Sequence, residues 1–312
     1  MRTSKSPKAV FQVAYLIGWA ALPAYTHRFS PQKFTQPQLF ACLVLKEFLQ
    51  LDYRKLQAVL IDSPELCATI DLAIVPHYTT FQKAARRLLQ MSLAKQLLDK
   101  TLRLAQVVGH LPPRVNLAAG DGTGWESHHV SHYYVKRRAS CSKFWQKTTY
   151  ATFPKAGVLC DTVSHLILAI VPARGPGPDI RHFQPLLDQG ARRIPVQAAA
   201  FDAGYDAEHS HVYARSRGIR TLIPPLIGRR TDQPPRGYWR RQMARRLHLT
   251  RYTQRWQAET VNSMLKRLMG SALRARTYWS QCREIVLRAI SLNVMILRHH
   301  HLFYRACLSP LD

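Results

Sequence analysis

Apolar residues in the N-terminal third of the chain are placed at helical spacing. Beginning with Leu39 and Leu43 they recur every three or four positions, which puts them on one face of an α-helix. Pro64 and Pro76 interrupt the pattern, since proline lacks the N–H that a helix interior needs. The pattern therefore predicts a helical domain over residues 1–110.

One predicted helix of this region is strongly basic. In "VPHYTTFQKAARRLLQ", Thr79 or Thr80 can cap a helix that carries Lys83, Arg86 and Arg87, because a threonine oxygen can accept from the first free N–H groups of a helix. Such a domain suits DNA binding by a helix-turn-helix. A helical lid with a purely structural role is the alternative.

Beyond residue 110 the pattern changes to short apolar runs. "RVNLAAGDGTGW" and "PVQAAAFDAGYD" are typical of buried strands that end in an acid, Asp121 and Asp202. "YYVKRR", "TTYATFPKAGVLCDTV" and "SHLILAIVPARG" indicate antiparallel strands, and helix-like runs alternate with strands further on. This order predicts a mixed α/β sheet flanked by helices over residues 111–300, with residues 301–312 as a short tail.

The stretch "RYTQRWQAETVNSMLKRLMG", residues 251–270, predicts an amphipathic helix. At about 100° per residue, and with Glu259 at zero, three other polar residues fall within about 40° of it: Tyr252, Arg255 and Lys266. The opposite side carries apolar residues that can pack on a sheet: Val261, Met264, Leu265 and Leu268. A surface pair of Arg255 with Glu259, worth about 0.2–0.5 kcal/mol, explains two of these polar residues and leaves the other two unexplained.

Asp121, Asp202 and Glu259 together indicate a carboxylate site. The carboxyl ends of strands are where ligands bind in open α/β sheets, although either aspartate by itself also fits a turn or a cap. Three clustered carboxylates repel one another unless a cation lies between them. Mg²⁺ prefers oxygen ligands, and two such ions can act on one phosphodiester.

The composition narrows the class of partner. The chain carries 45 Lys and Arg against 18 Asp and Glu, a net charge of +27, and such a field attracts polyanions, of which nucleic acid is the commonest. A ribosome-like or membrane-surface protein is the alternative. The hydrophobic content of 46% excludes a disordered tail. The six cysteines are scattered and never form C-x-x-C, which favours reduced thiols over a disulfide frame or a zinc site.

The first 26 residues have a basic start and an apolar stretch that imitate a signal peptide. The apolar part is too short and too interrupted to span a bilayer, and a buried helix explains it equally well. We expect a cytoplasmic protein, associated with the nucleoid through DNA and not with a membrane.

Three motifs resemble one family. "YTQRWQAETVNSMLK" has the Y-x-x-R-x-x-x-E-x-x-x-x-x-x-K signature of DDE-type insertion-sequence transposases, position for position. "AAGDGTGWE" and "FDAGYDAEHSHVYARSRGIRTLIPP" resemble the first and second aspartate blocks of that family, and "YWSQCREIVLRAISLNVMIL" resembles its helical tail. The resemblance covers about residues 115–298.

The resemblance implies an RNase H-like core in which Asp121, Asp202 and Glu259 hold two Mg²⁺ ions, for which Mn²⁺ can substitute. Such an enzyme cleaves transposon ends and transfers the 3′-OH into target DNA, as a homodimer or a larger synaptic complex. The resemblance places Tyr252, Arg255 and Lys266 on phosphates of the transposon end. We further expect Arg251 and Trp256 to contact DNA, the tryptophan by stacking on a base unless it packs within its own domain.

The spacing departs from some relatives, which carry a long β-rich insertion before the glutamate. Here that region is predicted to be a basic loop, residues 226–250, with seven arginines interleaved with Tyr238 and Trp239 in "RRTDQPPRGYWRRQMARR". Such a loop suits binding to a DNA strand, or is a merely solvated surface. Glu126 and Asp206 stand close to the two aspartates, but the family uses the earlier acid of each block.

Three rival functions stay open on the sequence. They are an RNase H-like nuclease without strand transfer, a domesticated non-catalytic DNA-binding protein, and an RNA-binding protein whose acids are incidental. The presence of Asp121, Asp202 and Glu259 together counts against the second, because decay most easily strikes the acids that hold the metal.

Overall fold

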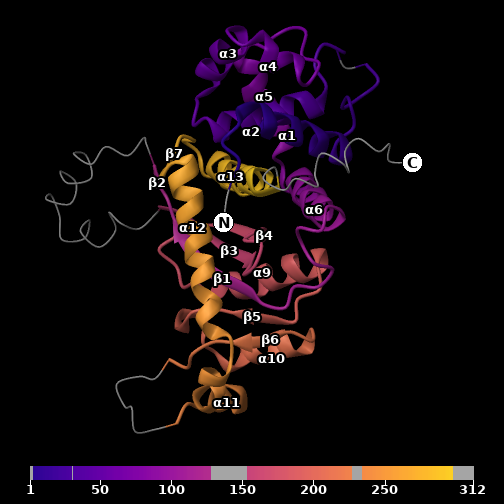
Figure 1. Ribbon diagram of the computed structural model, residues 1–312. Helices are drawn as coiled ribbons and strands as arrows, with labels where there is room; N and C mark the ends of the chain where they lie inside the picture. The colour runs from indigo at the N-terminus through magenta and orange to yellow at the C-terminus, as the bar shows by residue number, and fades with distance from the viewer. Residues whose placement is uncertain (1–2, 30, 128–152, 227–233, 298–312) are drawn as a thin grey trace, which may run out of the picture. The chain divides into compact units, whose positions relative to one another are not determined.

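The computed structural model describes residues 3–29, 31–127, 153–226 and 234–297 (Figure 1). The chain divides into two compact units. The first, which we call the helical unit, comprises Met1–Leu111 and Leu265–Asp312, and the second, the sheet unit, comprises Pro112–Met264. The division falls inside one helix, α12 (Trp256–Met269).

The helical unit is built from the helices that the apolar spacing predicted, together with a C-terminal helix. They are α1 (Pro7–Ala21), α2 (Gln36–Phe48), α3 (Tyr53–Ile61), α4 (Pro64–Ala68), α5 (Tyr78–Leu88), α6 (Met91–Val107) and α13 (Tyr278–Leu297), with a short strand β7 (Ala272–Leu273) before α13. Thr35 and Gln38 form a capping box at the start of α2, which satisfies two backbone N–H groups that the helix leaves free. Helix α13 packs against α1, α2 and α6.

The apolar N-terminal stretch forms α1, whose buried side chains face α2 and α6. Of the two interpretations of that stretch, the structure therefore supports the buried helix. None of the described helices is long and apolar enough to cross a membrane.

The predicted threonine cap of the basic helix α5 is wrong. The helix begins at Tyr78, before both threonines, and His77 at its N-cap makes no side-chain cap hydrogen bond. The N–H of Tyr78 donates instead to Gln57 Oε1 of α3 at 3.1 Å. Thr79 Oγ1 pairs with His77 Nδ1 at 2.8 Å, so a neighbouring helix replaces the local cap.

The sheet unit contains a five-stranded mixed sheet, and the predicted mixed α/β fold with a helical N-terminal region is confirmed. Its order is β4 (Ile167–Gly175), β3 (Phe153–Asp161), β1 (Ala118–Gly124), β5 (Ala198–Ala200) and β6 (Arg220–Leu222). Strands β4, β3 and β1 are antiparallel neighbours, whereas β1, β5 and β6 run parallel. The short β2 (Glu126–Ser127) follows β1.

Helices connect and cover these strands. Helix α9 (Ile180–Arg193) covers β3 and β4, and α10 (Glu208–Ser216) packs on β6 (Figure 1). A 3₁₀ turn η1 (Ala203–Tyr205) follows β5. After β6 come α11 (Tyr238–Arg246) and the 3₁₀ turns η2 (Leu247–Leu249) and η3 (Tyr252–Arg255), which lead into α12.

Two details of the predicted sheet region need revision. The basic region 226–250 is not a loop throughout, because Tyr238–Arg246 forms α11 and Leu247–Leu249 a 3₁₀ turn. The expected strand "YYVKRR" lies outside the described residues.

Candidate active site

The register of the sheet brings Asp121 and Asp202 side by side. Strands β1 and β5 are parallel, with Ala119 opposite Ala200, and each aspartate stands two residues beyond that pair in the same direction. Neighbouring strands lie about 4.8 Å apart, so the two carboxylates share the carboxyl edge of these strands. The prediction that its strand ends at Asp121 is wrong, because β1 continues to Gly124 along β3.

Asp121 is half-buried and held by two donors. The N–H of Gly122 donates to Oδ1 at 2.9 Å, and Asn262 Nδ2 of α12 donates to Oδ2 at 3.0 Å. Burial raises the pKa of Asp121 and the charge of Asp202 adds to the rise, while Gly122, Arg255 and Asn262 oppose it. The raised pKa therefore reflects mainly the cost of burying a charged carboxylate, with a smaller contribution from the neighbouring acid.

Asp202 acts as the N-cap of η1, where its Oδ1 accepts from the N–H of Gly204. Behind it, Phe183, Phe201 and Tyr205 form an aromatic cluster with ring centroids 4.8–6.4 Å apart. A Cβ at Gly120 would lie 2.0 Å from the Phe201 ring, so only glycine fits beside that ring. The ring cluster and the glycine thus fix the backbone from which both aspartates project.

Glu259 lies in the first turn of α12, where the positive end of the helix dipole favours an acid. Its side chain is 55% exposed and accepts a hydrogen bond from Arg255. Burial would lower the pKa of Arg255, but the contact with Glu259 raises it, and Asp121 adds to the rise. Arg255 therefore faces both Glu259 and Asp121.

The three predicted acids are brought together only in part. Asp121 and Asp202 are neighbours, and Glu259 stands one helical turn before Asn262, which contacts Asp121. However, the carboxylate of Glu259 is bound to Arg255. Among the described residues, no group of three or more His, Cys, Asp or Glu side chains is arranged to hold a metal ion.

The predicted single helix over this signature is wrong at its start. Tyr252–Arg255 forms the 3₁₀ turn η3, and α12 begins at Trp256. Residues three apart eclipse in a 3₁₀ helix, so Tyr252 and Arg255 still share a side. Tyr252 packs with Leu247 on a buried cluster at the strand ends: Leu117, Ala198, Ala200 and Leu222. Burial raises the pKa of Tyr252, although Arg255 opposes the rise.

The other residues predicted to contact DNA differ in solvent exposure. Trp256 is 53% exposed, so its ring does not pack in the hydrophobic core. Arg251 is exposed at the start of η3. Lys266 is half-buried and lies on the part of α12 that belongs to the helical unit. The apolar side of α12 is buried as predicted at Val261, Met264 and Leu265.

The sequence reasoning missed Asn262. It is 7% exposed, and its Oδ1 has no hydrogen-bond partner in the described part of the chain. At about 100° per residue Asn262 falls about 60° from Glu259, on the predicted polar side of the helix, so residue spacing did not mark it as buried. Its amide is what joins α12 to Asp121.

The carboxylate of Asp206 binds Arg240 and the backbone N–H of Leu226. Its side chain is fully buried and accepts from Arg240 Nη2 at 2.6 Å and from the N–H of Leu226 at 2.7 Å, and His211 Nε2 lies 3.8 Å away. Burial would raise the pKa of Asp206, but these donors lower it to about 2. A carboxylate committed in this way has no room for a metal ion.

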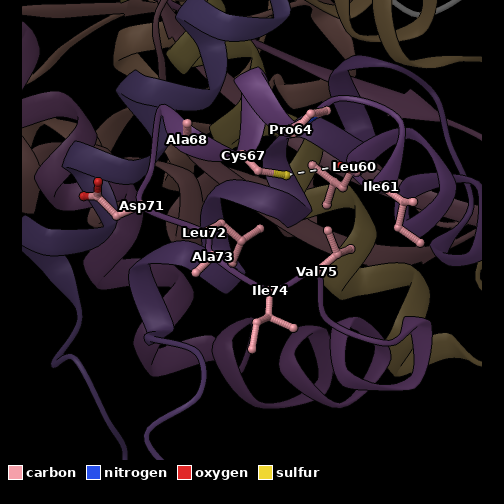
Figure 2. Close-up of a pocket in the computed structure, with 10 residues that line it drawn as sticks. All are labelled: Leu60, Ile61, Pro64, Cys67, Ala68, Asp71, Leu72, Ala73, Ile74 and Val75. Carbon is pink, nitrogen blue, oxygen red and sulfur yellow. Dashed lines mark hydrogen bonds between the residues drawn. The ribbon is translucent and has the colours of Figure 1, made fainter.

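A hollow in the helical unit carries no comparable chemistry. It has a volume of about 880 Å³ and is lined mainly by apolar side chains from Leu60 to Val75 (Figure 2). Its titratable groups are Asp71 and Cys67, and Cys67 Sγ donates to Leu60 O at 3.3 Å. Burial raises the pKa of the Cys67 thiol, so this cysteine is a poor nucleophile.

A mixed sheet of this order, flanked by helices, defines the class as an RNase H-like α/β protein. The sequence matches the family described as a transposase DDE domain over residues 116–294, more than half of the chain. The chain therefore belongs to the DDE transposase family and is a DNA transposase, an enzyme of the polynucleotidyl transferase and endonuclease class.

No curated protein matches the sequence. Among solved structures, a pre-cleavage Mos1 transpososome is similar at 12% identity and a TM-score of 0.22, with 86% of this chain and 80% of that chain covered. A likeness at this level carries no argument.

Proposed function

We propose that this transposase is Mg²⁺-dependent, cleaves the ends of its own element and transfers the resulting 3′-OH into target DNA. Asp121, Asp202 and Glu259 are the proposed catalytic and metal-binding residues. The observation that supports this most directly is the position of Asp121 and Asp202, each two residues beyond the Ala119–Ala200 pair of parallel strands.

The donor set suits a hard cation. All three side chains offer carboxylate oxygens, the ligands that Mg²⁺ and Mn²⁺ prefer. Burial is the main cause of the raised pKa of Asp121, and the charge of Asp202 adds to it; a bound cation would stabilise the ionised carboxylate. Bound Mg²⁺ would supply activation of the attacking oxygen and stabilisation of the leaving one. Asn262 and Gly122 orient the Asp121 carboxylate.

Glu259 has to change partner for this role. In the free protein Arg255 neutralises it, and a DNA phosphate competes for the same guanidinium, which binds phosphate and carboxylate in the same forked manner. We propose that DNA takes Arg255 and thereby releases Glu259 toward the two aspartates. The exposed position of Glu259 leaves its side chain free to turn.

The DNA contacts follow from the same segment. Tyr252, Arg255 and Lys266 are the proposed partners of phosphates at the transposon end, with Arg251 and Trp256 beside them. Because transposition joins two ends to one target, we propose that the chain acts as a homodimer or larger synaptic complex with DNA.

An end-joining assay tests the function. It uses a labelled duplex that carries the inverted repeat flanking the element, a target plasmid and Mg²⁺. Joined product supports the transposase, cut ends alone indicate a nuclease, and metal-independent binding without either indicates a binding module.

Single substitutions test the residues. Asp121→Ala, Asp202→Ala and Glu259→Ala should each abolish cleavage while binding to the end duplex persists, because each removes a metal ligand and leaves the phosphate-binding side chains in place. Glu126→Gln is the matched control, since Glu126 is an exposed acid in the same segment as Asp121. Cleavage that survives in one of the three Ala variants would remove that residue from the site.

A further inference from the structure

Helix α11 is short, basic and held tightly to the body of the sheet unit. Its sequence YWRRQMARR contains no acid, and it packs on α10 (Figure 1). The Coulomb field of four arginines on nine residues opposes such packing unless acids or other groups compensate it.

Two acids from the segment after Asp202 provide that compensation. Arg240 donates to Asp206 through both Nε and Nη2, at 2.6–3.0 Å. Glu208 accepts the backbone N–H groups of Trp239 at 3.0 Å and Arg240 at 3.2 Å, so it caps the start of α11 where Gly237 offers no side chain. We call Asp206 and Glu208 the acidic clasp.

The ring of Trp239 strengthens this attachment. The guanidinium of Arg215 on α10 lies 4.2 Å from the centroid of the Trp239 ring, a cation–π contact. Met243, one turn further along α11, is buried. One side of α11 is thus fixed by ionic, aromatic and apolar contacts at once.

The opposite side of α11 is a basic stripe. At about 100° per residue, Arg241 and Arg245 fall within about 60° of Tyr238, whereas Met243 and Arg240 fall about 140–200° away. Tyr238 is 61% exposed, and both stripe arginines are exposed. No carboxylate in the described parts of the chain forms an ion pair with Arg241 or Arg245.

Helix α11 is attached to the segment that directly follows Asp202. Helix α11 docks on the start of α10, which follows Asp202 after the carboxyl end of β5. Leu247, directly after α11, packs on the same buried cluster as Tyr252. The chain therefore leads from the stripe, through residues that pack on the parallel strands, directly into the signature segment.

We infer that the stripe Tyr238, Arg241 and Arg245 is a docking surface for the phosphate backbone of duplex DNA next to the cleaved end, and that the acidic clasp exists to hold it rigid. The inference rests on the proposed function. Contacts to phosphate carry no sequence information but fix the register of the DNA. A stripe that is already ordered loses little conformational entropy on binding.

The test compares two double variants that remove the same charge. The first, Arg241→Gln with Arg245→Gln, removes both positive charges of the stripe. Arg192→Gln with Arg220→Gln is the control, because these exposed arginines lie in the last turn of α9 before β5 and at the first residue of β6, at the amino ends of the parallel strands. Binding to a fluorescein-labelled end duplex and to a scrambled duplex is measured against salt concentration.

We expect the slope of log K against log salt to fall by about 0.9 for each arginine–phosphate interaction removed, so by about 1.8 in the stripe variant, on both duplexes. The control should keep the slope of the unmodified protein. Equal slopes in the two double variants would overturn the inference while leaving the proposed function intact. Absence of binding by the unmodified protein would overturn the proposed function as well.

The role of the acidic clasp is tested by a substitution for which net charge and positioning predict opposite effects on DNA binding. Asp206→Asn adds one positive charge overall, so bulk attraction alone would strengthen DNA binding. If the clasp positions the stripe, binding should weaken several-fold instead, with the melting temperature recorded to exclude loss of fold. Stronger binding by a folded Asp206→Asn variant would overturn the role of the clasp.

Discussion

At the scale of the residue, Asn262 contacts an acid of the proposed site although it does not belong to the family signature. It comes from α12, its amide donates to Asp121, and it is buried on the side of the helix that faces the sheet unit. A carboxylate in a metal site needs a fixed orientation, and groups that hold ligands in place commonly affect metal affinity about 10–100-fold.

Asn262→Ala should therefore raise the Mg²⁺ concentration needed for half-maximal cleavage about 10–100-fold while binding to the end duplex stays unchanged. Asn262→Asp should be worse, because it places a further negative charge against Asp121, whose pKa is already raised. A metal titration of single-turnover cleavage checks this. If both variants lose activity with an unchanged metal requirement, Asn262 is structural.

Asp206 gives a residue-scale expectation for pH. Its pKa is lowered from 3.8 to about 2, so its stabilising contribution is full above about pH 4 and is lost as the pH falls toward 2. The shift corresponds to about 2 kcal/mol. The difference in unfolding free energy between the unmodified protein and Asp206→Asn should shrink over that range in urea titrations; a pH-independent difference would contradict the linkage.

At the scale of the element, helix α12 shows which features the sequence could predict and which it could not. The exposed and buried sides followed from residue spacing, because one apolar face must pack. The spacing did not predict the 3₁₀ turn at Tyr252–Arg255, whose Tyr252 packs on strand residues distant in the sequence. Helix α11 was missed because its basic sequence has no apolar periodicity and is held by acids some thirty residues earlier.

Removing either partner of the Arg255–Glu259 ion pair should change the affinity for DNA, and in opposite directions. Arg255→Gln should weaken binding to the end duplex and lower its salt slope by about 0.9, because one guanidinium no longer binds phosphate. Glu259→Gln should strengthen binding, because it frees Arg255 from its partner, although it abolishes cleavage. Fluorescence anisotropy at several salt concentrations measures both. Weaker binding by Glu259→Gln would argue against competition for Arg255.

At the scale of the whole molecule, the order of the chain is not the order of its compact units. Sequence spacing predicted a helical domain over residues 1–110 and a catalytic domain over residues 111–300, and this division stays a prediction. In the structure, α13 packs with the N-terminal helices. Sequence could not show this, because α13 is buried on all sides from Glu284 to Leu297, so no polar face marks which elements it packs against.

Buried charges link α13 to α2 and to the backbone that precedes it. Arg288 is 1% exposed and donates to Glu284 at 2.8 Å and to two backbone carbonyls, of Gly270 and Ala272. Its Nε also lies 3.4 Å from Glu47 on α2. Removing one member of a buried ion pair leaves the other uncompensated, which costs about 3–5 kcal/mol.

A fragment of residues 1–111 should accordingly fail to fold, because α1, α2 and α6 lose the helix against which they pack and Glu47 loses Arg288. The same fragment joined through a flexible linker to residues 265–297 should fold cooperatively, and Arg288→Ala in that joined fragment should lower its unfolding free energy by about 3–5 kcal/mol. Circular dichroism with urea titration measures all three. Cooperative unfolding of residues 1–111 by themselves would show that the N-terminal helices form an autonomous domain, as the order of the chain first predicted.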